Sequence, residues 1–294
     1  MIANKLLIGL LLGTLFFQVG CASKRTAGWD KDSAELKLTS RESRVIWKTA
    51  VRQWRDRHEK ESLLKALEGF EKVAKANPDH YEAMIYLCRG KYLLADGHTD
   101  EVDAKKKIFE EGITWGERAM ATNPDFRKKM KETEGEVEDS LSLLNRKQID
   151  SIYWTATNLG KWAANSGIAT RLKYKGRIKK MINRVGELDK EYFYHAFDRF
   201  YGAYYAIAPG FAGGDINKSK DSFDRSIKMS KNYLGTKVLK AKHWATKAGD
   251  KKVFTKLLKE VLAANPKADK KIMPENIIEQ RKAKKLLSKT NELF

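Results

Sequence analysis

Apolar and polar residues follow a helical period over most of the chain. From Ser40 nearly to the C-terminus, apolar residues recur at spacings of three and four, and no alternating run is long enough to predict a strand. Only 5 prolines occur among 294 residues, so long helices are permitted. Residues 99–104 and 129–139 interrupt the pattern, and we interpret the second interruption as an acidic loop or frayed helix end. The pattern predicts an all-α body over residues 40–294.

Helical runs end repeatedly in the same way, with an Asn followed by a Pro. The three pairs are Asn77-Pro78, Asn123-Pro124 and Asn265-Pro266. Asn tolerates the conformation found at helix ends, and the residue before a proline is pushed out of the helical region. Such stops are typical of the turns between helix–turn–helix units.

The same segments carry a weak internal repeat. A small or apolar residue is followed by a second apolar or small residue four positions later and by a third after three more, which is the tetratricopeptide spacing. The spacing occurs at Ala66, Phe70 and Val73; Gly112, Gly116 and Ala119; Ile178, Ile182 and Val185; Ser219, Phe223 and Ser226; and Phe254, Leu258 and Val261. Gly160 and Gly202 occupy positions where the first helix of a repeat needs a small residue for close packing. We therefore predict stacked helix hairpins of a cryptic tetratricopeptide-like α-solenoid, whose concave side commonly binds a ligand.

The N-terminal residues have the pattern of a targeting segment. Lys5 precedes an apolar run over residues 6–17, and Cys21 follows shortly after. This predicts a lipoprotein signal peptide over residues 1–20, a diacylglycerol and a further acyl chain such as palmitate on Cys21, and a polar tether over residues 21–39. Gln18 stands where such signals prefer Leu, and a signal peptide cut elsewhere or an uncleaved anchor is the alternative.

The cysteine count agrees with an acylated Cys21. The only other cysteine is Cys88, so no disulfide framework is available. Cys88 lies in an apolar helical stretch, which predicts a buried structural thiol. Ala22 and Ser23 lack the Asp that often retains lipoproteins at the inner membrane, so we expect a periplasmic lipoprotein of the outer membrane.

The formal net charge of +20 has two interpretations. Nucleic acid would be the obvious partner in a cytosolic protein, but an exported chain rarely meets it. The lysines are dispersed along the predicted helices, which is typical of a solvated face. The functional alternative is attraction to anionic lipids, an acidic partner or anionic solutes.

No motif for catalysis or metal binding is present. The 5 histidines are scattered, and none has a second His or Cys at ligand spacing. The glutamates between 132 and 138 are typical of a solvated segment. We predict no catalytic residues, no metal and no cofactor; an enzyme built from residues distant in sequence is the third-ranked hypothesis.

Two features are candidates for lining a ligand site or lumen. The first is a set of aromatic residues on two predicted helices, because tyrosines combine an apolar body with a hydroxyl that needs a partner. Its members are Tyr153, Trp154, Trp162, Tyr201, Tyr204 and Tyr205. The second is the pair Gly213 and Gly214, which precede Asp215, the expected cap of the next helix, and which could turn their amides toward an anion. Core packing and a simple turn between repeats are the respective alternatives.

Several stretches together resemble the T-component (TatT) family of proteins associated with TRAP transporters. They are residues 152–156 and 160–162, 185–192, 200–205 with Pro209 and 213–215, 222–226, 242–245, 254–266 and 276–287. The resemblance extends from about Ser62 to the C-terminus.

The resemblance implies a function in transport. Members would be periplasmic lipoproteins of cryptic tetratricopeptide helix pairs, which form homo-oligomers and associate with a TRAP-type solute-binding protein. Such systems import organic acids or other small, often apolar, ligands. Our first hypothesis is therefore a transport accessory that offers the solute a helical groove or pore. The second is an envelope scaffold lipoprotein that binds proteins or peptidoglycan through its repeats.

Overall fold

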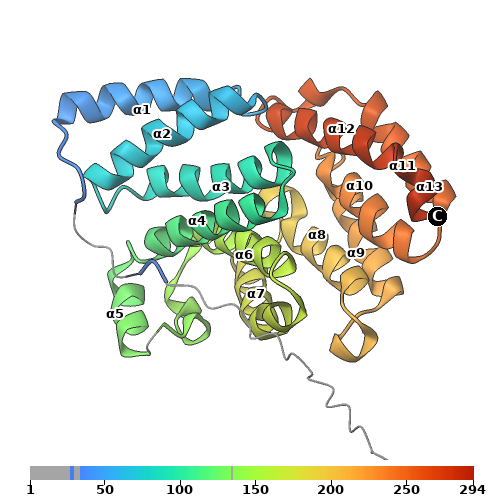
Figure 1. Ribbon diagram of the computed structural model, residues 1–294. Helices are drawn as coiled ribbons and strands as arrows, with labels where there is room; N and C mark the ends of the chain where they lie inside the picture. Colours follow the sequence, from blue (N-terminus) through green and yellow to red (C-terminus); the bar gives the residue numbers. More distant parts are fainter. Residues whose placement is uncertain (1–26, 30–33, 134) are drawn as a thin grey trace, which may run out of the picture.

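The computed structural model describes residues 27–29, 34–133 and 135–294 (Figure 1). Every regular element in these ranges is helical, and none of the described residues forms a strand. The predicted signal peptide and the proposed acylation site Cys21 lie outside the described residues.

The helices pack as successive antiparallel hairpins. These pair α1 (Ser40–Trp54) with α2 (Lys60–Ala76), α3 (Tyr81–His98) with α4 (Val102–Met120), α6 (Ile149–Ala164) with α7 (Ile168–Leu188), α8 (Tyr192–Ile207) with α9 (Ile216–Met229), and α10 (Gly235–Leu239) with its π-helical continuation η5 (Lys240–Ala245) against α11 (Lys251–Ala263). The short α5 (Pro124–Glu132) stands between the second and third hairpins. Helices α12 (Met273–Leu287) and α13 (Thr290–Leu293) complete the chain.

Short 3-10 turns join several of these helices. They are η1 (Val137–Asp139), η2 (Leu141–Leu143), η3 (Arg146–Gln148), η4 (Gly210–Ala212) and η6 (Pro266–Ala268). The predicted acidic loop corresponds to the end of α5 and η1. The all-α hairpin architecture predicted from the sequence is therefore confirmed.

The repeat spacing marks the second helix of each hairpin. All fifteen residues of the five predicted triplets are buried, on α2, α4, α7, α9 and α11. Close packing explains the small members of the pattern, since a Cβ on Gly116 would lie 1.9 Å from Thr155 Oγ1 of α6. Gly202 likewise faces the ring of Phe223, whose nearest atoms would be 2.7 Å from a Cβ. The prediction for Gly160 is wrong, because a Cβ there would meet nothing within 4 Å.

The Asn-Pro pairs end one helix and also cap the helical turn that follows. Asn123 has an extended backbone, and its side chain accepts hydrogen bonds from the amides of Asp125 and Phe126 at the start of α5. The side chain of Asn265 accepts from the Lys267 amide in the same way. Each Asn therefore satisfies amides that the next turn leaves without a backbone partner.

Part of the predicted tether packs on the helical body. The Gly28 amide donates to Glu117 Oε2 over 2.8 Å, and the buried ring of Trp29 packs against Phe126 with centroids 5.8 Å apart. The Glu35 amide donates to the carbonyl of Lys75 over 2.8 Å. The apolar area of Trp29 accounts for this difference from the prediction, because its indole gains a place in the core.

The succession of hairpins closes on itself through α12. In Figure 1, α12 lies beside the end of the α1–α2 hairpin, although 196 residues separate Ala76 from Met273 in sequence. Arg57, in the α1–α2 connection, pairs with Glu275 of α12, and Ile278 packs on Gly97 of α3. Lys285 pairs with Asp100 at 2.5 Å. These contacts hold α12 against the N-terminal hairpins.

Candidate functional site

Charged and aromatic side chains fill the region where the N-terminal and C-terminal hairpins meet. One hydrophobic core is built mainly from α1 to α7, and a second, smaller core from α9 to α12. We call the residues between them the central seam. Its members are Arg57, Arg89, Tyr92, Asp96, Lys161, Phe193, Arg199, Tyr233, Lys242, Glu275, Glu279 and Lys282.

At one end of the central seam, two arginines share one carboxylate. Glu275 Oε2 lies 2.6 Å from Arg57 Nη2, and Glu275 Oε1 lies 2.6 Å from Arg89 Nη2. Burial alone would raise the pKa of Glu275, but the two guanidinium groups outweigh it and lower that pKa. The carboxyl is therefore ionised, and the group as a whole carries a net positive charge.

A second cluster repeats this arrangement with lysines. Asp96 accepts from Lys161 at 2.6 Å and from Lys282 at 2.7 Å, and Lys282 also pairs with Glu279 at 2.7 Å. Burial would raise the pKa of Asp96, but the two ammonium groups hold it well below its usual range. The side chains of Asp96, Lys161 and Lys282 keep 15%, 28% and 25% of their surface exposed, so solvent reaches this cluster.

An unusual backbone turn builds the middle of the central seam. Phe193, Tyr194 and His195 have φ values of 43°, 59° and 55°, in the left-handed region that such bulky residues rarely adopt. The turn directs the carbonyls of Phe193 and Tyr194 at the guanidinium of Arg199, with distances of 3.0 and 2.8 Å. The backbone strain is therefore coupled to the placement of one buried cation.

Aromatic rings complete the surroundings of these arginines. The Phe193 ring lies between Arg89 and Arg199, whose guanidinium carbons are 5.1 and 5.7 Å from its centroid. Arg199 also stacks on Tyr233 at 4.4 Å and donates to the Tyr153 hydroxyl over 3.0 Å. Arg199 forms no ion pair with a carboxylate among the described residues.

Lys242 and His243 enter from η5. Burial and then the neighbouring charges of Lys161 and Lys282 lower the pKa of Lys242. Burial, followed by Lys242, lowers the pKa of His243 to about 3, so its ring is neutral at physiological pH. Lys242 has no carboxylate partner among the described residues. The residue as a whole is exposed to solvent, so its surroundings enclose the side chain only in part.

The composition of the central seam favours an anion with an apolar part. Its six cationic side chains outnumber its three carboxylates, and Arg199 and Lys242 are the two cations without a carboxylate partner in the described chain. Phe193 and Tyr233 place aromatic rings beside Arg199, and the ring of Tyr92 lies beside Lys161. A ligand carboxylate would neutralise part of this excess, and the rings would contact an apolar portion of the same ligand.

The comparison with protein families identifies the chain's relatives. The family model described as TRAP transporter T-component matches residues 73–294. The chain belongs to the TRAP transporter T-component family. This is a transport accessory component and not a known enzyme family. A search of curated proteins found no match.

The T-component match includes the aromatic residues predicted as lumen lining, which the structure distributes over three places. Tyr153 and Trp154 are buried behind the central seam, where Trp154 makes an edge contact with Phe193, with centroids 4.9 Å apart. Trp162 is buried in the first core, in edge contact with Tyr174. Its place favours the core-packing interpretation.

The third group of aromatic residues lies on the face of α8 toward α7, away from the central seam. The Tyr201 hydroxyl donates to Asn183 Oδ1 over 2.5 Å, and Tyr204 lies beneath the ammonium group of Lys179. Tyr205 packs against Tyr201, with centroids 5.5 Å apart. A depression of about 270 Å³ nearby is lined by Asn183, Gly186, Glu187, Lys190 and Phe197.

The predicted glycine pair belongs to a closed turn. The Gly213 amide donates to the carbonyl of Gly210, and the Gly214 amide donates to that of Pro209, each over 2.9 Å. Both amides are therefore engaged within the turn, which favours the interpretation as a connection between repeats. Asp215 caps α9 as predicted, accepting from the amides of Asn217 and Lys218 over 3.0 Å.

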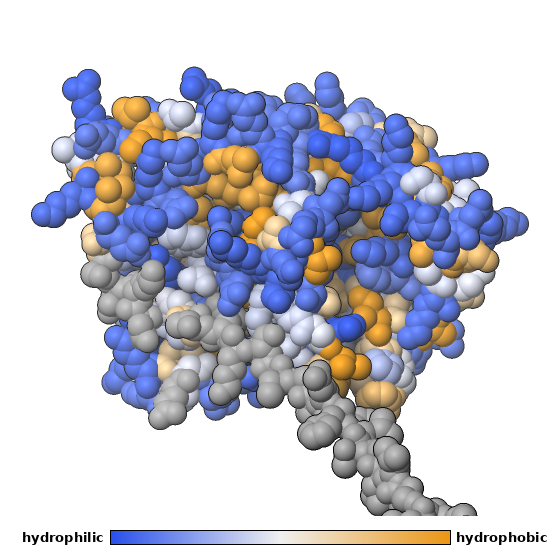
Figure 2. Space-filling model, in the orientation of Figure 1, coloured by the Kyte–Doolittle hydropathy of each residue, from blue (hydrophilic) through white to orange (hydrophobic). Residues whose placement is uncertain are grey.

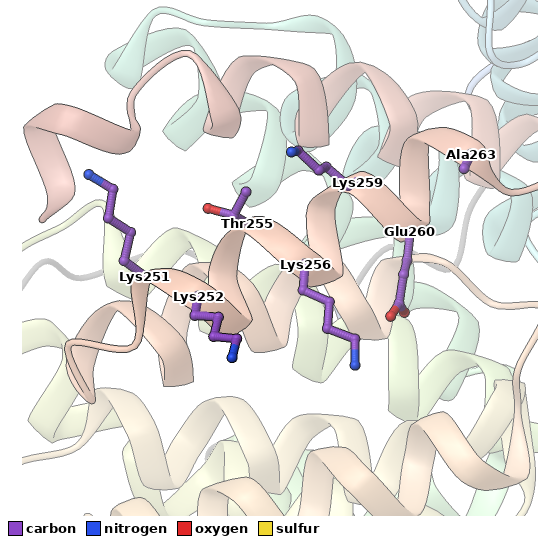
Figure 3. Close-up of a pocket in the computed structure, with 7 residues that line it drawn as sticks. All are labelled: Lys251, Lys252, Thr255, Lys256, Lys259, Glu260 and Ala263. Carbon is purple, nitrogen blue, oxygen red and sulfur yellow. The ribbon is translucent and has the colours of Figure 1, made fainter.

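A second surface depression, of about 920 Å³, follows the outer face of α11 (Figure 3). It is lined by Lys251, Lys252, Thr255, Lys256, Lys259, Glu260 and Ala263. In Figure 3 these side chains fan out to both sides of the helix and do not converge on a point. They fit the solvated basic face expected from the dispersed lysines.

The described residues contain neither a membrane-spanning helix nor a cluster of metal ligands. No helix within residues 27–29, 34–133 and 135–294 has the length and apolar character needed to span a bilayer. In the same ranges, no three His, Cys, Asp or Glu side chains come together as a metal site would require.

Most central-seam residues were missed in the sequence. Arg89 and Glu275 are 186 positions apart, as are Asp96 and Lys282, and each is one of many charged residues on amphipathic helices. The local signals were faint: Arg89 directly follows a buried stretch, and Lys161 stands beside Trp162. A charged residue on an otherwise apolar helix face was the one feature of the sequence that could have indicated these buried ion pairs.

Proposed function

We propose that this T-component is a periplasmic lipoprotein accessory of a TRAP-type solute transport system. It would associate with the solute-binding protein of that system and hold the solute in the central seam. The observation that carries the proposal is the family match over residues 73–294, combined with the unbalanced positive charge of the central seam. The acyl group on Cys21 would attach the protein to the outer membrane.

The solute class follows from the side chains that would meet it. Lys242 and Arg199 supply positive charge that no carboxylate of the described chain neutralises. Tyr233 and Phe193 supply aromatic faces beside Arg199. This set is suited to small organic acids with an apolar portion. The lysines dispersed over the outer surface would also raise the local concentration of an anionic solute.

A matched pair of variants tests solute binding. Lys242→Met removes a central-seam cation that has no partner to lose, whereas Lys256→Met removes a lysine from the outer face of α11. We expect a panel of small mono- and dicarboxylates, screened by isothermal calorimetry, to contain a binder whose affinity falls roughly tenfold in Lys242→Met, because one charge-assisted hydrogen bond is lost. The Lys256→Met variant should bind normally. Equal affinity in both variants would exclude the central seam as the solute site.

Partner binding is tested separately. Purification of the chain from envelope extracts should co-purify a TRAP-type solute-binding protein, and native mass spectrometry of the chain alone should report a homo-oligomer. Recovery of peptidoglycan or other envelope proteins without any transport component would instead favour the scaffold function.

A further inference from the structure

One phenyl ring protrudes from the connection between α8 and α9. Phe211, within η4, is 87% exposed, and Ile207 at the end of α8 is 50% exposed. The connection lies at the lower edge of the molecule in Figure 1, and Figure 2 shows apolar atoms at the lower ends of α8 and α9 among the charged surface. Together Phe211 and Ile207 leave apolar area in water whose burial against a partner would be favourable.

The turn that carries Phe211 is held rigidly. The amides of Ala212 and Gly214 both donate to the Pro209 carbonyl over 2.9 Å, and the Tyr204 hydroxyl donates to the Ala212 carbonyl over 2.6 Å. Little conformational entropy therefore remains to be lost when the ring is buried by a partner. The turn is therefore preorganised, with the Phe211 ring already exposed before any partner binds.

Three lysines form a basic collar around this turn. Lys247 donates to the carbonyl of Ala208 over 3.3 Å, Lys218 pairs with Asp215 at 3.6 Å, and Lys179 lies over the ring of Tyr204. The carboxylate of the turn, Asp215, is occupied by the cap of α9. The tip is thus apolar at its point and positive around its base.

We propose that Phe211 inserts into the headgroup region of an anionic phospholipid bilayer, while Lys179, Lys218 and Lys247 contact the headgroup phosphates. Aromatic side chains favour the membrane interface, and basic residues beside it are attracted to anionic lipids. A bilayer is favoured over a protein partner because a single protruding ring needs no shaped pocket in a fluid surface. The contact would be independent of solute transport, and it would orient the body against the membrane in addition to any acyl anchor.

The test places an environment-sensitive fluorophore at the tip of the full chain. Phe211→Cys is labelled with a nitrobenzoxadiazole group and mixed with vesicles of phosphatidylcholine, with or without phosphatidylglycerol. The unsubstituted chain serves as the labelling blank, since its Cys88 is buried. Met229→Cys is the control, because Met229 is 58% exposed at the opposite end of α9.

We expect the emission of the label at position 211 to shift to the blue and brighten only with phosphatidylglycerol vesicles. The label at 229 should not respond. Adding Lys218→Glu and Lys247→Glu to the Phe211→Cys chain should abolish the shift. No response at 211, an equal response at 229, or an equal response with neutral vesicles would each overturn the proposal. An acyl anchor would act equally in all these samples, so it cannot produce the expected difference.

Discussion

Arg57 and Glu275 form a two-pronged ion pair across 218 positions of sequence. Arg57 Nε and Nη2 donate to Glu275 over 2.9 and 2.6 Å, and both side chains are buried. Arg57 also donates to the carbonyls of Trp54 and Lys271. The pair therefore fixes the last long helix to the first hairpin, alongside the contacts that Ile278 and Lys285 make with α3 and Asp100.

Removing one partner of this pair should be strongly destabilising. Arg57→Met leaves the Glu275 carboxylate buried beside only Arg89, and we expect a loss of about 3–5 kcal/mol in the free energy of unfolding. Urea denaturation followed by circular dichroism measures it. The control is Lys65→Met, which removes a pair with Glu61 on the exposed face of α2 and should leave the urea midpoint almost unchanged. Equal midpoints for the two variants would refute a structural role for the closure.

The hairpins could be predicted from the sequence, whereas their closure could not. Phe70, Phe223 and Phe254 reveal their burial locally, because the spacing of their neighbours matches one face of a helix. No such period links Arg57 to Glu275. With 58 basic and 38 acidic residues, the sequence allows very many pairings, and only the curvature of the stack selects one.

The left-handed turn at Phe193–His195 could not be predicted from the sequence either. Aromatic residues disfavour positive φ, so local propensity argues against the conformation that the fold imposes. Arg199 offsets part of this conformational strain by donating hydrogen bonds to the carbonyls of Phe193 and Tyr194. The central seam was therefore missed because its geometry depends on tertiary contacts that override local preference.

His243 should make the protein less stable as the solution is acidified. Its pKa falls from an ordinary 6.5 to about 3 in the folded state, first through burial and then through Lys242. Because the folded-state pKa is lowered, the stabilising contribution is complete above pH 6.5 and is lost as the pH falls toward 3. His243→Gln should flatten the decline of stability over this range, as measured by urea midpoints at a series of pH values.

Lys242→Met provides the matched comparison for that measurement. Removing the neighbouring ammonium raises the folded-state pKa of His243, so the decline should stop at a higher pH than in the unsubstituted chain. A decline of the same depth in the His243→Gln variant would show that other groups cause it.

Cys88 should be unreactive in the native protein. Burial raises the pKa of its thiol to about 12, and its sulfur lies 3.5 Å from Asn158 Nδ2 in the first core. Since the thiolate is the reactive form, we expect no labelling of Cys88 by a disulfide reagent at pH 8 until urea unfolds the chain. Peptide mapping by mass spectrometry assigns the label. Rapid labelling of Cys88 without denaturant would contradict its buried place on α3, packed against α4 and α6.

Two glycines separate the effect of close helix packing from that of helix propensity. At Gly116 a methyl group would lie 1.9 Å from Thr155 Oγ1 and 2.9 Å from Cys88 Sγ, so Gly116→Ala must push α4 away from α6. We expect a loss of about 1–3 kcal/mol in the free energy of unfolding, which is typical of overpacked cores. Gly160→Ala, within α6, meets nothing within 4 Å and should stabilise the helix by about 0.5–1 kcal/mol. Thermal unfolding of the two variants measures the difference. Both changes add one methyl group inside a helix, so helix propensity affects the two variants alike. Melting temperatures that shift in opposite directions would therefore reflect the close contact of α4 with α6 at Gly116. Shifts in the same direction would contradict that packing.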